Sequence, residues 1–489
     1  MASHAHDIGK PERVSVELIN QSCRWPVLML FAGALLWLVL GLLLGVLSSV
    51  KMHAPAFWAN CEWVTFGRLR PGFINVLVYG FATQAALGSA LWIVARLSRI
   101  ELLLGGLVFA GGLLLNAGVA VGLLQILAGQ STGYAWMEIP RQGAAVITAG
   151  YLLIALSALY TLHRRTEKEL YISAWFLVGG LLAFPWLMSI GYLLAVVNPL
   201  RGVMQSVAAA YLQNGLMHLW LTPMALALTY YLLPKVTGRE IHSNQAAAFG
   251  FWTLILFGAW SGTSLLAGGP VPRWIEGAGV SAKWLLIVPV AAYASNFILT
   301  AFAGKRGARS GIAWPFLLFG SLAYVAFILL DIYGTFQGPA RTLSLTPYSM
   351  GVTQLGLLGF VGMILLGGIC HITEKVLDAE FRRPAILVQI LFSLVGILMV
   401  VGGYVVSGFV SGAKLADPAI PFVTASRSLL PFFGMATLGF SVILLGQLVF
   451  EAGFTKLLLH TTADSRAGFC SWCCDKIETG SGKKARAGV

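Results

Sequence analysis

Long apolar stretches recur from residue 27 to residue 455 and constrain the fold more than any other feature of the sequence. A helix of about 20 apolar residues crosses the ~30 Å hydrocarbon core of a bilayer. In lipid every backbone N–H and C=O must bond within the chain, so spanning stretches of this kind form helices. The sequence therefore predicts an all-α integral membrane protein of about twelve transmembrane helices. We expect these helices over residues 27–50, 74–95, 101–129, 141–162, 170–197, 203–234, 246–268, 280–302, 311–333, 347–372, 383–410 and 426–455.

The composition leaves little room for a soluble domain. Of the 489 residues, 58% are hydrophobic and only 10% are charged, whereas a soluble domain has about 25% charged residues. Most of the surface must then face lipid. We expect a cytoplasmic N-terminal segment over residues 1–26, a membrane domain over 27–455 and a basic, cysteine-containing cytoplasmic tail over 456–489.

The basic residues are distributed unevenly between the two sides of the predicted bundle. With twelve spans both termini lie on one side, and 22 of the 32 Lys and Arg residues fall there. Lys and Arg collect in cytoplasmic loops because they resist translocation. The formal charge of +13 therefore indicates topology, and nucleic acid is not expected as a partner. Both termini are predicted to be cytoplasmic.

The tail carries a cluster of three of the six cysteines, Cys470, Cys473 and Cys474. A c-type haem site needs Cys-x-x-Cys-His, and here Cys474 stands in place of the histidine. A zinc site needs four ligands, with His460 the nearest further candidate. Juxtamembrane cysteines can also be acylated. We expect a reduced tail without metal, and the sequence leaves the role of the three cysteines open.

Polar side chains inside the predicted spans are candidates for function, because placing them in lipid costs several kcal/mol. They are Gln84, Asn116, Gln125, Asn214, His218, Asn296, Asp331 and Gln354. Hydrogen bonds between helices, worth about 0.6 kcal/mol on average, are the plainer explanation of each. Of the eight histidines, only His218 and His371 lie within predicted spans. The helical rise separates these two by about 20 Å in depth, too far to hold one haem between them.

Five short segments carry a resemblance to a known family. They are Phe66–Pro71 (Phe-Gly-Arg-Leu-Arg-Pro), Glu169–Trp175, Leu221–Lys235, Thr335–Pro339 and Gly356–Met363. In order and spacing these segments resemble the catalytic subunit I of the cbb-type cytochrome c oxidases, a branch of the haem–copper oxidase superfamily. The resemblance implies a twelve-helix bundle in the bacterial inner membrane, with haem b and copper as cofactors. It also implies partners that are other membrane subunits of a respiratory oxidase, including a cytochrome c subunit.

The metal ligands that the resemblance implies are missing from this chain. The family's six ligand histidines fall on Phe73, Val352 and Gln354 (haem) and on Asn214, Ser264 and Leu265 (copper). Its crosslinked tyrosine falls on Gly258 and a loop glutamate on Gln337. Phe, Val and Leu offer no donor atom to iron or copper, and neutral amides and hydroxyls are weak donors. We therefore expect no haem, no copper and no catalytic residue, and bulky side chains such as Phe73 filling the cofactor space.

Three functions follow from these observations. The first is a non-catalytic structural or assembly partner in a respiratory terminal oxidase complex. The second is a redox-active oxidase subunit that oxidises cytochrome c, reduces oxygen and pumps protons, as the resemblance alone implies. The third is a transporter or channel that reuses the scaffold. The further polar candidates for a site are His218, Asn296, Asp331 and Gln337. The family is one of oxidoreductases, but we do not expect this chain to be catalytic alone.

Overall fold

The computed structural model describes residues 15–302 and 311–484, with side chains described as far as residue 459. These residues form helices, turns and loops and contain no strand. Twelve helical stretches are long and apolar enough to cross a membrane, which confirms the predicted fold class. The spans in chain order are α1 (Val16–His53); α2 (Phe66–Asn75), η2 (Val76–Ala82) and α3 (Thr83–Ser98); α4 (Gly105–Leu127); α5 (Arg141–His163); α6 (Ile172–Tyr192) and η3 (Leu193–Val197); α7 (Val203–Gly215), η4 (Leu216–Leu221) and α8 (Thr222–Thr237); α9 (Asn244–Trp260) and η5 (Ser261–Leu266); α10 (Arg273–Leu285) and α11 (Ile287–Phe302); α12 (Trp314–Tyr333); α14 (Tyr348–Gln354), η6 (Leu355–Gly362) and α15 (Met363–Leu377); α16 (Arg383–Leu415); α17 (Phe422–Arg427) and α18 (Leu430–Lys484). The short helices η1 (Glu62–Val64) and α13 (Gln337–Leu343) lie between spans.

Three spans form the centre of the bundle, and they are the second, sixth and tenth. In these spans 94–100% of the most apolar 18-residue stretch is buried, against 33–61% in the other nine. The spacing of four shows that the arrangement repeats along the chain, because three peripheral spans separate the second from the sixth and three separate the sixth from the tenth. The interior of the molecule is therefore built from α2–η2–α3, α7–η4–α8 and α14–η6–α15.

Each central span contains a π-helical segment, namely η2, η4 and η6. A π-helical turn leaves carbonyl groups without their usual α-helical partners, and such turns are common at functional sites. In two of the three segments a threonine hydroxyl meets this need. Thr83 Oγ1 donates to Val78 O at 2.9 Å, and Thr222 Oγ1 donates to Met217 O at 2.8 Å. In η2 and η4 the freed carbonyl is thus satisfied by a side chain of the same span.

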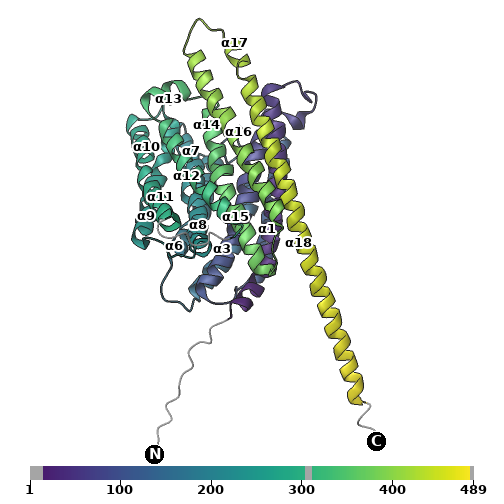
Figure 1. The fold of residues 1–489 in the computed structure, drawn as a ribbon. Helices are drawn as coiled ribbons and strands as arrows, with labels where there is room; N and C mark the ends of the chain where they lie inside the picture. The colour runs from purple at the N-terminus through teal and green to yellow at the C-terminus, as the bar shows by residue number, and fades with distance from the viewer. Residues whose placement is uncertain (1–14, 303–310, 485–489) are drawn as a thin grey trace, which may run out of the picture.

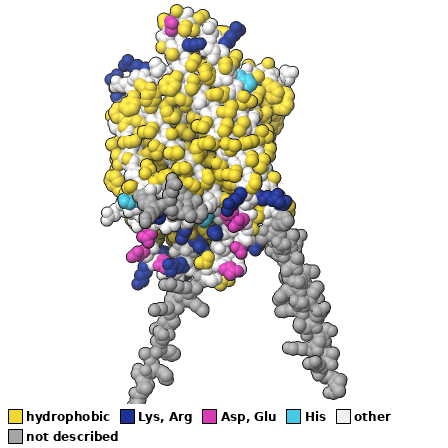
Figure 2. Space-filling model, in the orientation of Figure 1, with side chains coloured by type: hydrophobic (Ala, Val, Ile, Leu, Met, Phe, Trp, Pro, Cys, Tyr) yellow, Lys and Arg dark blue, Asp and Glu magenta, His cyan; other side chains and the backbone are white. Residues whose placement is uncertain are grey.

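The two ends of the bundle are distinguished by the elements and charges that they carry. The first turns of α1 and the C-terminal half of α18 lie at the lower end in Figure 1, whereas α13 and α17 lie at the upper end. Between the two ends the surface carries a broad apolar band, with charged side chains gathered mainly below it (Figure 2). Such a surface is the one expected in a bilayer. The chain is therefore a multi-pass membrane protein.

The first helix begins earlier than hydrophobicity predicts, because a cap sets its start. α1 begins at Val16, and the hydroxyl of Ser15 accepts a hydrogen bond from Leu18 N at 3.3 Å. A serine at this position satisfies a backbone N–H that the first turn would otherwise leave free. Residues 16–26, predicted to precede the membrane domain, are consequently the first turns of α1.

The segment Phe66–Pro71 is helical, and its prediction as a loop is wrong. Its charged side chains suggested a loop, but they are accommodated at the upper end of the bundle. Arg68 Nη1 donates to Leu127 O at 3.0 Å, which ties α2 to the end of α4. At the other end of the chain, α18 runs to Lys484 and so extends through most of the predicted tail. The side chains of Cys470, Cys473 and Cys474 lie outside the described residues.

Candidate functional site

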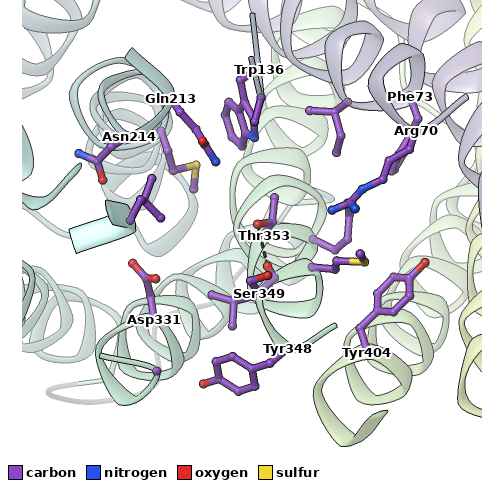
Figure 3. A pocket seen from close by; sticks show the side chains of 18 of the residues that line it. Arg70, Phe73, Trp136, Gln213, Asn214, Asp331, Tyr348, Ser349, Thr353 and Tyr404 are labelled. Atoms are coloured by element: carbon purple, nitrogen blue, oxygen red, sulfur yellow. Dashed lines mark hydrogen bonds between the residues drawn. The ribbon is translucent and has the colours of Figure 1, made fainter. Parts of the chain in front are cut away.

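A cavity of about 640 Å3 lies in the upper half of the bundle (Figure 3). We call it the central cavity, and its wall includes residues of all three central spans and of α1, α10, α12 and α18. All six positions that the resemblance assigns to haem and copper ligands line it. They are Phe73, Asn214, Ser264, Leu265, Val352 and Gln354. The fold therefore brings residues from four distant parts of the sequence around one space.

Phe73 lies where α1, α2 and α18 meet at the edge of the central cavity. Its side chain is buried, and its ring packs edge-on against Phe440 with the ring centroids 5.3 Å apart. A Cβ atom added at Gly45 would lie only 2.9 Å from the Phe73 ring, so α1 and α2 approach closely here. The central cavity persists beside this ring. Its many polar side chains allow water to enter, so it carries no penalty for a dry void.

The copper-ligand positions are occupied by side chains that bond to their neighbours. Asn214 Nδ2 donates to Gly258 O at 2.8 Å, and its Oδ1 accepts from Ser261 Oγ at 3.1 Å. Ser264 Oγ donates to Ser261 O at 2.7 Å. The two bonds of Asn214 hold α9 and η5 against α7, whereas the Ser264 bond lies within η5. Leu265 is half exposed and offers no polar atom.

Among the described residues, His218 is the one imidazole in the wall of the central cavity. It projects from η4, and its ring stacks on Phe327 with centroids 5.9 Å apart. His218 Nδ1 and Gln354 Oε1 are buried polar atoms without a hydrogen-bond partner among the described residues. Val352, in the same helix α14 as Gln354, is buried and apolar. The two unpartnered atoms are places where water or a bound molecule can form hydrogen bonds.

A buried ion pair closes one side of the central cavity. Lys283 Nζ of α10 lies 3.0 Å from Asp331 Oδ1 of α12, and only 4% of the lysine side chain is exposed. Asp331 was among the predicted polar candidates, and the structure places it in the cavity wall. Lys283 is not apparent from the sequence, because it lies at the polar start of a span, where basic residues are ordinary.

A second charged group lies on the opposite side, near the upper loops. Asn75 Nδ2 donates to Glu138 Oε2 at 2.6 Å. Burial raises the pKa of Glu138, and the hydrogen bond from Asn75 and the charge of Arg70 only partly oppose this rise. Arg70 and Glu138 both line the central cavity, and Figure 3 shows the Arg70 side chain directed into it. In the sequence the only signal for Glu138 is a lone carboxylate between apolar residues.

The donors in the central cavity do not fit haem or copper. In the part of the chain that the structure describes, no three His, Cys, Asp or Glu side chains are grouped so that they could hold a metal ion. His371 lies away from the cavity, with its ring centroid 6.1 Å from that of Trp92. One histidine with amide, hydroxyl and hydrocarbon neighbours is a poor ligand set for either metal.

Two of the four further site candidates, Asn296 and Gln337, lie outside the central cavity, as do the polar span residues Gln84, Asn116 and Gln125. Asn296 is at the lower end, where its Nδ2 donates to Ser243 O at 2.8 Å and its Oδ1 accepts from Ser243 N at 3.1 Å. It therefore fixes the start of α9. Gln337 is the exposed first residue of α13. The structure thus joins His218 and Asp331 to the six ligand positions and leaves these two apart.

Comparison with known proteins identifies relatives over nearly the whole chain. A cbb3-type cytochrome c oxidase subunit, CcoN1, of Stutzerimonas stutzeri is 24% identical over 448 residues, which are 87% of this chain and 91% of that protein. A bacteroid cytochrome c oxidase subunit 1 homologue of Bradyrhizobium diazoefficiens is 23% identical and covers 85% of this chain and 79% of its own length.

A solved structure has the same fold. The cryo-EM structure of a haem–copper terminal oxidase dimer matches with a TM-score of 0.68 and 13% identity, covering 90% of this chain and 84% of that one. The family model described as cytochrome c and quinol oxidase polypeptide I matches residues 25–442. The chain therefore belongs to the cytochrome c and quinol oxidase polypeptide I family.

Proposed function

We propose that this cytochrome c oxidase subunit I-like membrane protein is a non-catalytic member of its family that binds neither haem nor copper. It serves as a structural or assembly partner in a respiratory oxidase complex. One observation carries the proposal: the six ligand positions surround a single cavity, and none of them carries an imidazole. Asn214 of α7 bonds to Gly258 of α9, Ser264 bonds within η5, and Phe73 packs against Phe440. These side chains support the bundle.

The proposed partners are other membrane subunits of a respiratory oxidase, including one that carries haem c. The upper end offers exposed aromatic side chains for such contacts, with Trp58, Trp63 and Phe336 exposed by 59%, 50% and 44%. Aromatic residues are enriched at protein interfaces. We expect purification in a mild detergent to retain at least one further membrane protein or c-type cytochrome. A chain that stays monomeric at every detergent-to-lipid ratio contradicts this part of the proposal.

The cofactor content is tested on the isolated subunit. We expect a reduced-minus-oxidised spectrum without a Soret band, and iron and copper far below one atom per chain. In the described part of the chain His218 supplies the only imidazole of the cavity wall, so it is the residue through which a haem would most readily be held. A Soret band close to stoichiometric with the protein, and lost in His218→Ala, contradicts the proposal and restores a redox role.

A second candidate is a transporter or channel, and the persistence of the polar central cavity favours it. The cavity holds an ion pair and two unpartnered polar atoms, His218 Nδ1 and Gln354 Oε1, as a solute site would require. The two candidates differ in their dependence on partners. A structural subunit loses its effect on respiration when the oxidase partner is deleted, whereas a transporter reconstituted alone in liposomes still moves its solute.

A further inference from the structure

We propose that the lower end of the bundle binds a phosphate group, supplied by the head group of an anionic phospholipid. The site is a groove of about 830 Å3 that shares no lining residue with the central cavity. It lies where the ends of α3, α5 and α8 meet the starts of α1, α6 and α9. We call it the lower groove. Its polar wall includes Arg96, Arg99, Arg165, Glu167, Tyr171 and Lys235.

The lower groove carries an excess of positive charge. Arg99 Nη1 lies 2.7 Å from Glu167 Oε1, so these two charges balance each other. Among the described residues that line the groove, Arg96, Arg165 and Lys235 then remain, opposed by the exposed Glu169. Three cations in one groove attract an anion, and the guanidinium fork suits the oxygens of a phosphate.

Two guanidinium nitrogens in the lower groove lack an acceptor. Arg96 Nη1 and Arg165 Nε are buried and have no hydrogen-bond partner among the described residues. The Arg96 guanidinium lies over the ring of Trp92, 5.5 Å from its centroid, which fixes its position. An unsatisfied buried donor of this kind costs about 1–3 kcal/mol. A phosphate oxygen that reached either nitrogen would remove that cost for its side chain.

The start of α6 adds backbone donors to the same groove. Tyr171 is the N-cap residue of this 21-residue helix, and its side chain makes no capping hydrogen bond. The first N–H groups of the helix therefore lack a side-chain acceptor and carry the positive end of the helix dipole. The start of α9 differs, since Ser243 Oγ accepts from Ala246 N at 3.1 Å. A phosphate at an uncapped helix start is a recurrent arrangement.

The rim of the lower groove favours a lipid over a soluble phosphate. Trp175, Leu170 and Val16 line the groove and are exposed by 37%, 42% and 56%. Tryptophan is enriched at the head-group level of membranes, and exposed apolar side chains beside it give acyl chains a surface. Basic pockets between transmembrane helices bind anionic head groups. The proposed lipid site thus includes Glu169–Trp175, one of the segments that carry the family resemblance.

Native mass spectrometry of the full chain tests the proposal. The protein is released from mild detergent after exposure to phosphatidylglycerol, to cardiolipin or to phosphatidylcholine, and also to inorganic phosphate alone. We expect one anionic phospholipid to stay bound at detergent concentrations that strip phosphatidylcholine. Equal retention of phosphatidylcholine overturns the proposal, because the groove would then not distinguish an anionic phospholipid from one without net charge. Binding of inorganic phosphate without lipid retention overturns the lipid as its source.

Substitutions locate the lipid at the lower groove. We expect Arg96→Gln with Arg165→Gln to weaken retention about 30-fold, since each basic side chain near a membrane surface contributes about fivefold. The matched control is Arg164→Gln. Arg164 neighbours Arg165 in sequence but lies outside the groove, with Nη2 bonded to Tyr160 OH at 3.0 Å. It should retain lipid as the unmodified chain does.

A conservative variant separates loss of binding from loss of folding. Arg165→Lys keeps the charge but loses the fork, and we expect retention between that of the unmodified chain and that of Arg165→Gln. Thermal unfolding of each variant without lipid shows whether it is folded. If folded Arg96→Gln and Arg165→Gln variants hold the lipid as tightly as Arg164→Gln does, the lower groove is not the site.

Discussion

Lys283 Nζ and Asp331 Oδ1 lie 3.0 Å apart and join α10 to α12 at the wall of the central cavity. The lysine is nearly inaccessible, and the aspartate side chain is 22% exposed. The lysine needs the aspartate, because only 4% of its side chain is exposed and the ammonium would otherwise be buried without a counter-charge. Both charges are side chains of the bundle, so the pair forms without a cofactor.

Removal of one partner of this pair should destabilise the protein strongly. We expect Asp331→Asn to lower the free energy of unfolding by about 3–5 kcal/mol, because the Lys283 ammonium is left buried without a counter-charge. Thermal unfolding in detergent measures the effect. The double variant Lys283→Met with Asp331→Leu should recover much of the loss. As a control, Glu167→Gln breaks the exposed pair with Arg99 and should cost at most about 1 kcal/mol. Equal effects of Asp331→Asn and Glu167→Gln would show that the cavity wall is fully solvated.

Phe73 is predicted to contribute by packing. Phe73→Ala should destabilise the bundle by about 3–5 kcal/mol, because a buried ring is lost next to an existing cavity. The exposed Phe336 serves as control, and Phe336→Ala should change the stability by no more than about 0.5 kcal/mol. Denaturation followed by tryptophan fluorescence measures both. A Phe73→Ala variant as stable as the unmodified chain would mean that the ring packs loosely.

The buried carboxyl of Glu138 makes stability depend on pH. Its pKa is raised from the ordinary value of 4.5 in the folded protein, mainly by burial. The unfolded chain therefore releases this proton first, and stability falls as the pH rises from about 4.5 through the folded pKa. We expect Glu138→Gln to flatten the dependence of the unfolding temperature over this range. Glu62→Gln, at an exposed carboxyl in η1, should leave the dependence unchanged. A Glu138→Gln profile that parallels the unmodified chain would contradict the burial effect.

The predicted orientation is testable by labelling. In a cysteine-free chain, single cysteines at positions 60 and 415 should react with an impermeant thiol reagent in intact cells, while those at 240 and 380 should not. All four positions are exposed at helix ends or in loops, so differences in labelling report on the side of the membrane. The expectation follows from the excess of Lys and Arg on the side of the termini. Labelling at 240 in sealed cells would reverse the topology.

The number and order of the spans are predictable from the sequence, because the bilayer demands about 20 apolar residues for each crossing. The starts of α1 and α2 cannot be predicted from hydrophobicity, because both helices extend beyond the apolar stretch. Ser15 caps the first, and Arg68 bonds to the end of α4 in the second. Hydrophobicity marks where a helix crosses the lipid, and hydrogen bonds mark where it ends.

The site is predictable only in part, for a related reason. The six ligand positions come from the family resemblance, and the structure gathers all of them around one cavity. Lys283 and Glu138 escape prediction because their burial depends on helices that are distant in sequence. Asn296 shows the opposite error. Its place inside a span made it a candidate for the site, but its amide bonds to Ser243 and fixes the start of α9.

The π-helical segments η2, η4 and η6 divide each central helix into two halves that are out of phase. One additional residue in a turn rotates everything beyond it by about 100°. In the span Val203–Thr237, Asn214 on the upper side of η4 faces the cavity, while Tyr230 on the lower side is packed against Tyr293, with ring centroids 5.8 Å apart. A substitution in the upper half changes side chains at the cavity, whereas the Tyr230–Tyr293 contact belongs to the lower half. Deletion of one residue within Leu216–Leu221 would instead turn the upper half as a unit and carry Asn214 away from Gly258.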